Sequence, residues 1–142
     1  MSIRSDPCVR RILIAASDSA VTDARDALGD EFELVTVKSL PEALDKLDHT
    51  YVAFLCSVRF DESKMFDFVR EVRARPQLSD LPIICFRAHD KQLSQSAHLA
   101  LEQTVPLFKN TWFLDLHQIA AHDGLAAALG ELRRSLMSVV AR

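Results

Sequence analysis

The sequence predicts an α/β fold in which a doubly wound, five-stranded parallel sheet carries helices on both faces. Five short apolar stretches alternate with segments whose apolar residues recur at helical spacing, and the connections between them are short. The clearest unit is residues 51–73, in which an unbroken apolar run is followed by a polar loop and an amphipathic helix. Such a run is typical of a strand buried on both faces of a parallel sheet, and the alternation requires right-handed crossovers.

Length and composition favour one domain over residues 1–142, with residues 1–9 expected to be a flexible lead-in. A net charge of −3 gives no electrostatic reason to expect nucleic acid or an anionic membrane as a partner. The chain has no apolar run near the roughly 20 residues of a membrane span and no secretory signal pattern, so we expect a cytoplasmic protein. With only three glycines, no glycine-rich phosphate loop can be written.

In the first half of the chain, residues 11–16 (RILIAA) form the first expected strand. The Ser-Asp-Ser sequence at 17–19 offers good N-caps for a helix that Gly29 ends. Residues 32–37 alternate between apolar and polar and predict the second strand. The sequence Ser-Leu-Pro-Glu at 39–42 is a capping-box pattern and opens the second helix.

The third expected strand, residues 51–56, leads through a loop at 58–64 into a helix that starts near Met65 and stops at Pro76. Residues 81–86 (LPIICF) predict the fourth strand, with proline at its start, where a missing donor is tolerated. A loop at 87–91 and a fourth helix with an apolar stripe over 93–101 follow.

Two segments compete for the last strand, residues 105–108 (VPLF) and 111–116 (TWFLDL). We prefer the second, because a loop there would expose a tryptophan, a phenylalanine and a leucine. The Asp123-Gly124 pair caps a final helix with a long leucine stripe. The cysteines and the five histidines lack metal-ligand spacing, so buried thiols at 56 and 85 and surface imidazoles are expected, and no metal site.

Three ungapped segments carry a family resemblance: RILIAASDS at 11–19, LCSVRFDESKMFDFVREVR at 55–73 and LPIICFRA at 81–88. Through them, residues 10–140 resemble the receiver domain of bacterial two-component response regulators (CheY-like). The resemblance implies a flavodoxin-like sheet with strand order 2-1-3-4-5.

The chemical positions of that family are not matched. A receiver holds Mg²⁺ with an acidic pair after its first strand, and those positions are Ala16 and Ser17, with Asp18 one residue beyond. The phosphoacceptor aspartate after the third strand falls at Ser57, or at Cys56 if the register slips by one. Neither side chain can form an acyl phosphate. The resemblance therefore implies a degenerate pseudo-receiver.

Two further positions depart from the pattern. The hydroxyl residue after the fourth strand of a receiver falls at Arg87, and the lysine after the fifth falls at Lys109 if residues 105–108 are the strand. If residues 111–116 are the strand, the position equivalent to that lysine falls near Leu116, and the chain has no lysine there.

Arg87 has two expected placements. Its guanidinium either folds over the emptied pocket, pairing with Asp18 or Asp61 or bonding the Ser57 hydroxyl, or points into water.

The resemblance implies a phosphorylation-independent signalling or protein-interaction module that is not an enzyme and uses no cofactor. Its partner would be a histidine kinase, another regulator, an output protein or a second copy of the chain. The expected contact surface is the helix 4–strand 5–helix 5 face, with Phe108, Trp112 and Arg133 as candidates.

An alternative of a different class is a small α/β enzyme or small-ligand binder that uses the crevice around Ser17, Asp18, Ser57 and Arg87. Serine-hydrolase chemistry at Ser57 is disfavoured, because no glycine flanks it to form a nucleophile elbow.

Overall fold

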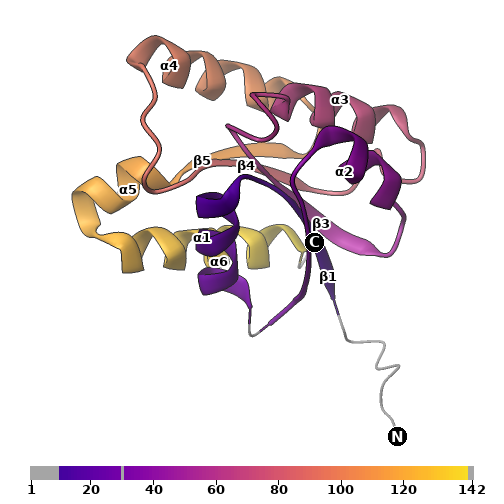
Figure 1. The fold of residues 1–142 in the computed structure, drawn as a ribbon, viewed down its shortest axis with the longest axis horizontal. Helices are drawn as coiled ribbons and strands as arrows, with labels where there is room; N and C mark the ends of the chain where they lie inside the picture. The colour runs from indigo at the N-terminus through magenta and orange to yellow at the C-terminus, as the bar shows by residue number, and fades with distance from the viewer. Residues whose placement is uncertain (1–9, 30, 141–142) are drawn as a thin grey trace, which may run out of the picture.

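The computed structural model of the chain describes residues 10–29 and 31–140, so the predicted lead-in at 1–9 lies outside the described residues. The strands are parallel and lie in the order β2-β1-β3-β4-β5 (Figure 1). The predicted five-stranded doubly wound sheet and its strand order are confirmed. The strands are β1 (Arg11–Ala15), β2 (Glu33–Val37), β3 (Tyr51–Ser57), β4 (Ile83–Arg87) and β5 (Thr111–Asp115).

Helices cover both faces of this sheet. Helices α1, α5 and α6 lie against one face, and α2, α3 and α4 lie against the other. None of the helices in the described residues combines the length and the apolar content that a membrane span requires. The helices are α1 (Asp18–Leu28), α2 (Leu40–Lys46), α3 (Met65–Ala74), α4 (Gln95–Thr104), α5 (Leu116–Asp123) and α6 (Leu125–Val140).

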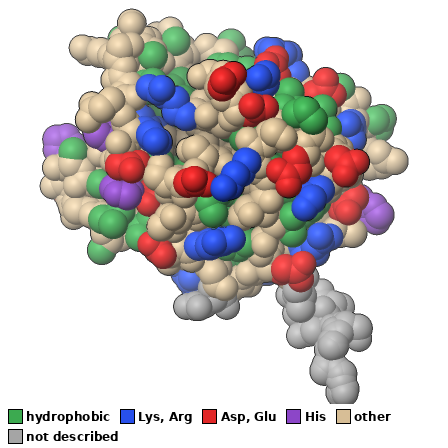
Figure 2. Space-filling model, in the orientation of Figure 1, with side chains coloured by type: hydrophobic (Ala, Val, Ile, Leu, Met, Phe, Trp, Pro, Cys, Tyr) green, Lys and Arg blue, Asp and Glu red, His purple; other side chains and the backbone are tan. Residues whose placement is uncertain are grey.

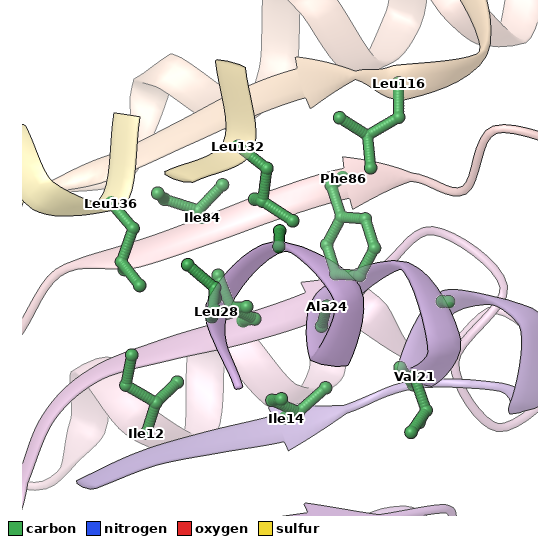
Figure 3. Packing of buried hydrophobic residues seen from close by; sticks show 14 of the residues in the cluster. Ile12, Ile14, Val21, Ala24, Leu28, Ile84, Phe86, Leu116, Leu132 and Leu136 are labelled. Carbon is green, nitrogen blue, oxygen red and sulfur yellow. The ribbon is translucent and has the colours of Figure 1, made fainter. Parts of the chain in front are cut away.

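The sheet separates two hydrophobic cores. Successive residues of a strand point to opposite faces, so in β1 Ile12 and Ile14 enter one core while Leu13 and Ala15 enter the other. Figure 3 shows the first core, in which leucines of α1 and α6 meet side chains of β1 and β4. The second core is aromatic, with Phe68 of α3 making edge contacts with other phenylalanines. The central strands are therefore buried on both faces, as their continuous apolar runs predict.

The serine cap predicted before α2 is present, and the Glu42 side chain bonds the N–H of the residue before the cap rather than that of the cap itself. The Ser39 hydroxyl accepts a hydrogen bond from the Glu42 backbone N–H at 3.2 Å, and the Glu42 carboxylate accepts one from the Lys38 N–H at 3.0 Å. A third contact joins this helix to the loop after β3, because Asp61 Oδ2 accepts from the Leu40 N–H at 2.7 Å. The start of α2 is thus tied to the loop that borders the candidate site.

The C-terminal third differs from the prediction in one element. Strand β5 is Thr111–Asp115, and residues Val105–Leu107 form a 3₁₀ turn, so the preferred assignment of the last strand is correct to within one residue. Helix α5, which follows at once, was not predicted. It begins because the Asp115 carboxylate caps it by accepting from the Gln118 N–H at 2.9 Å. It ends at Gly124, whose φ of +96° favours glycine, so Asp123 belongs to α5 rather than to the start of α6.

Candidate site at the carboxyl edge of the sheet

The carboxyl ends of β1, β3, β4 and β5 bring together the residues on which the sequence analysis focused. Ala16 follows β1 and is fully buried, and Ser17 is the N-cap residue of α1. Ser57 ends β3, and Arg87 ends β4. The sheet register also places Arg87 directly opposite Asp115 of β5.

Arg87 and Asp115 form a bidentate ion pair at this edge. Arg87 Nε donates to Asp115 Oδ1 at 2.9 Å and Nη2 donates to Oδ2 at 2.7 Å, and both side chains are buried. This corrects both expected placements of Arg87, because the guanidinium neither contacts Asp18, Asp61 or Ser57 nor points into water. The physical reason is the register: a fork-shaped guanidinium meets a carboxylate on the adjacent strand at the distance that paired hydrogen bonds require.

The Asp115 carboxylate collects further polar contacts. It caps α5, and its Oδ2 lies 2.8 Å from Nδ1 of His98 on α4, close enough for charge attraction although the direction does not form a hydrogen bond. Burial by itself would raise the pKa of this carboxyl group. The hydrogen bonds from Arg87 and the Gln118 backbone, with the charges of Arg87 and His98, outweigh burial and lower the pKa of Asp115 from its usual value. Asp115 is therefore an anionic junction between β4, α4 and α5.

Ser57 and Cys56 lie on opposite sides of β3. Ser57 lines a small cavity together with Ser17, Val58 and Arg87. Cys56 packs in the second core opposite Cys85 of β4, as expected for a buried thiol. Burial raises the pKa of both thiols, that of Cys85 to about 12. Of the two residues considered for the phosphoacceptor position, only Ser57 faces the cavity.

The two carboxylates considered as partners in the pocket are used elsewhere. Asp18 is exposed and pairs with Lys38, whose Nζ lies 2.6 Å from its Oδ1, and this contact lowers the pKa of Asp18. Asp61 binds the start of α2 and lies near Lys64. Within the described residues, no group of three or more His, Cys, Asp or Glu side chains is arranged to hold a metal ion.

Lys109 is not part of the site. It precedes β5 instead of following it, and its ammonium group pairs with Asp80. The carboxyl edge of the sheet is at the other end of this strand. Lys109 was predicted to be a pocket residue only if residues 105–108 formed the fifth strand. That strand does not form, because the segment is a 3₁₀ turn.

The three candidates for a partner face have different neighbours. Phe108 stacks on Phe66 of α3, with ring centroids 5.9 Å apart. Trp112 is half-buried and faces α6, on the side of β5 opposite to Phe113, as strand alternation predicts. Arg133 of α6 pairs with Glu31 just beyond α1. The three side chains therefore do not form one patch.

Two histidine contacts were missed by the sequence analysis, which expected exposed imidazoles. Asp23 of α1 is buried and accepts hydrogen bonds from His89, at 2.9 Å from the backbone N–H and at 2.8 Å between Oδ1 and Nδ1. His98 is mostly buried between α4 and β5. Asp23 was the available signal, because it occupies the apolar face of a predicted amphipathic helix. A buried carboxylate requires a partner.

On the face shown in Figure 2, basic and acidic side chains are interspersed. That face therefore carries no extended basic field of the kind that binds nucleic acid.

Comparisons with known proteins agree on the fold. The sequence matches no protein-family model and no curated protein. The structure is similar to a putative response regulator from Chloroflexus aurantiacus (22% identity, TM-score 0.68, covering 94% of this chain and 99% of that one). It is also similar to the phosphorylated cyanobacterial phytochrome response regulator RcpA (12% identity, TM-score 0.66, covering 93% and 94%).

A third similar structure is the receiver domain of a sensor histidine kinase from Pseudomonas aeruginosa, solved with a magnesium ion in its active-site cleft (19% identity, TM-score 0.61, covering 94% and 99%). At these identities the likeness concerns the fold. The chain has the fold of a response regulator receiver domain.

Proposed function

We propose that this protein is a receiver-like signalling module that binds a protein partner without being phosphorylated. The observation that carries the proposal is the composition of the strand edge. Ala16, Ser17 and Ser57 stand where a receiver gathers its carboxylates, and the end of β4 holds Arg87 in a buried pair with Asp115. Without those carboxylates the edge lacks the hard oxygen ligands that Mg²⁺ prefers and an acceptor for an acyl phosphate.

The same pair supports a fixed conformation. In receivers the residue at this position carries a hydroxyl that moves toward the phosphoryl group. Arg87 cannot make such a movement without separating its charge from Asp115, and breaking one side of a buried pair typically costs about 3–5 kcal/mol. A state with the pair broken would be rarely populated, so the module presents one surface to its partner rather than two.

We place the partner surface on α4 and the turn that follows it. Two large apolar side chains are exposed there, Leu99 on α4 at 46% and Leu107 in the 3₁₀ turn at 82%. His98 and Asp115 connect α4 to the Arg87 pair, so this surface is coupled to the strand edge. The partner is a histidine kinase, another regulator, an output protein or a second copy of the chain.

The first test asks whether the chain accepts phosphate. We expect no phosphoryl mass on the intact protein and no saturable change in Trp112 fluorescence during titration with Mg²⁺ and acetyl phosphate. The cyanobacterial phytochrome response regulator RcpA, whose solved structure is phosphorylated, is the positive control for the added mass. A phosphoryl adduct on any carboxylate of the chain would refute the proposal.

The second test concerns the surface. Binding to histidine kinases and regulators of the source organism, and self-association, are measured with and without acetyl phosphate. We expect equal binding in both conditions, loss of binding in L99E/L107E, and full binding in L125E, which introduces a charge at an exposed leucine of α6 (41%). Binding that requires the phosphodonor, or that survives L99E/L107E, would contradict the proposal.

The alternative function, binding of a small ligand in the crevice beside Ser57, has less support, because the cavity there is too narrow for a water-sized sphere. Ser17 and Ser57 both line it. Catalysis by either serine is not part of this candidate, because within the described residues no histidine or carboxylate bonds to either hydroxyl.

A further inference from the structure

A groove between α3 and α4 is open to solvent although apolar side chains form most of its lining. It encloses about 580 Å³, and small-molecule sites usually enclose about 300–1,000 Å³. Met65 and Phe66 of α3 line one side, and Leu101 of α4 lines the other. Val58 and Leu93 separate the groove from the small cavity at the strand edge. A mostly apolar groove of this size is the usual setting for a small ligand.

The sequence of α4 explains why the groove is not closed. Of the ten residues of α4, all within the described range 31–140, only Leu101 is buried. Ala97 and Ala100 line the groove, and their short side chains leave the space toward α3 unfilled. A larger side chain at either position would occupy that space, so the two alanines keep the groove open.

The segment that leads into α3 holds its backbone in an unusual conformation. Asp61, Glu62 and Ser63 have φ values of +45°, +55° and +72°, and such left-handed conformations cost free energy in residues other than glycine. The segment is kept in place because Asp61 Oδ2 accepts a hydrogen bond from the Leu40 N–H at 2.7 Å. Ser63 itself lines the groove. Strained backbone is concentrated at ligand sites and other functional positions, so its place beside the groove supports a binding role.

The lining of the groove carries one full charge, and this charge is positive. Arg59 lines the groove, and no Asp or Glu does. One of the five N–H groups of its guanidinium donates to the Gln92 carbonyl at 2.8 Å. Within residues 10–29 and 31–140 the Arg59 side chain pairs with no carboxylate, and it is exposed. The groove therefore combines an apolar surface with one uncompensated cation.

From these observations we propose that the groove binds a small monocarboxylic acid with an apolar body. The carboxylate pairs with Arg59, because the planar guanidinium fork matches its two oxygens. The body lies against Phe66 and Leu101 and fills the space beside the two alanines of α4. Binding is noncovalent and requires no metal ion. A cationic ligand is disfavoured, because the lining offers a like charge and no carboxylate.

This site goes beyond the proposed partner binding and uses other residues. Leu99 and Leu107, which form the proposed partner surface, do not line the groove. The acid contacts α4 on the side that faces α3, and Val58 and Leu93 keep it out of the cavity beside Ser57. Loss of one binding activity therefore does not require loss of the other.

The test is isothermal titration calorimetry of the full chain with 2-naphthoate and, separately, with decanoate, at constant pH and ionic strength. We expect saturable binding of at least one acid to the parent, with an affinity about tenfold weaker or worse in R59Q. The amide of that acid has no charge, so it should bind the parent and R59Q equally. If only 2-naphthoate binds, the apolar body is aromatic, and if only decanoate binds, it is aliphatic.

A second variant tests the apolar part of the groove. A100F places a phenyl ring in the space beside α3, so it should weaken binding of the acid about tenfold or more. Circular dichroism checks that A100F remains folded. Its matched control is Q103F, which adds the same ring at an exposed position of α4 that does not line the groove. Q103F should bind the acid like the parent.

The matched control for R59Q is R25Q, which removes an exposed arginine of α1 that forms no ion pair in the described part of the chain. It should also bind the acid like the parent. Absence of saturable binding of both acids to the parent, or equal binding in R59Q and R25Q, would overturn the proposal. Equal binding in A100F and Q103F would do the same.

The titrations contain no phosphodonor and no partner protein. Their failure therefore leaves the proposed partner binding standing, and the reverse also holds.

Discussion

At the scale of residues, Arg87 and Asp115 define the candidate site more than any other pair. They end neighbouring strands in register, so the sheet brings their side chains together. The sequence analysis identified Arg87 but not its partner, because the partner follows from the register of β4 and β5, and the last strand had two possible positions. The position of Ser57 was predictable, since it depends only on where one continuous apolar run ends.

We predict that D115N lowers stability near neutral pH by about 3 kcal/mol, because it leaves the buried Arg87 guanidinium without its counter-charge. The pKa of Asp115 is lowered in the folded protein, so its stabilisation is present above the usual carboxyl value of 3.8 and is lost as pH falls through the lower folded value. The stability difference between parent and D115N should therefore shrink below about pH 3.8. Urea denaturation across the acidic range measures it.

The control for this prediction is D67N, which removes the carboxylate of an exposed ion pair with Arg70 on α3. Exposed pairs contribute at most about 1 kcal/mol, so D67N should unfold almost like the parent near neutral pH. If D115N were as stable as D67N, the Arg87–Asp115 pair would have no role in fixing the strand edge.

At the scale of elements, the strands and the early helices were predictable because local signals agree with the fold. The serine cap before α2 and the continuous run of β3 each specify their element without help from distant residues. Helix α5 was not predictable in this way. Its N-cap residue, Asp115, is also the last residue of β5. The sequence pattern therefore predicts one continuous strand where the structure has the end of a strand and the start of a helix.

The end of α5 can be tested at Gly124, which joins α5 to α6. Gly124 has φ +96° and ψ 163°, a conformation that is almost restricted to glycine, so G124A should destabilise the protein by about 1–3 kcal/mol. G130A is the matched control. Gly130 lies inside α6 and a Cβ there would meet nothing within 4 Å, so alanine should stabilise by about 0.5–1 kcal/mol. Thermal unfolding of both variants decides, and a neutral G124A would mean that α5 and α6 are joined differently.

At the scale of the whole molecule, the fold and the candidate site have different origins. The strands and the two cores follow from apolar patterning, which is spread over the chain and tolerates local errors such as the missed α5. The strand order followed from the family resemblance. The site depends on a few polar contacts between residues far apart in sequence, such as Asp23 with His89 and Asp115 with His98. Patterning can show that a polar residue such as Asp23 lies on the apolar face of a helix and needs a partner, but it does not identify the partner.

The two cores share one sheet, and we predict that they unfold together. L132A removes a buried leucine from the core under α1 and α6, and F68A removes an aromatic side chain from the core under α3. Each should cost about 2–5 kcal/mol, without changing the dependence of the unfolding free energy on denaturant. L107A, at an 82% exposed position, should stay within about 0.5 kcal/mol of the parent.

Trp112 faces α6, so its fluorescence reports one side of the sheet while circular dichroism reports the whole. Coincident transitions in F68A would show that the loss of one core is transmitted through the strands to the other, and separated transitions would show that each face folds independently.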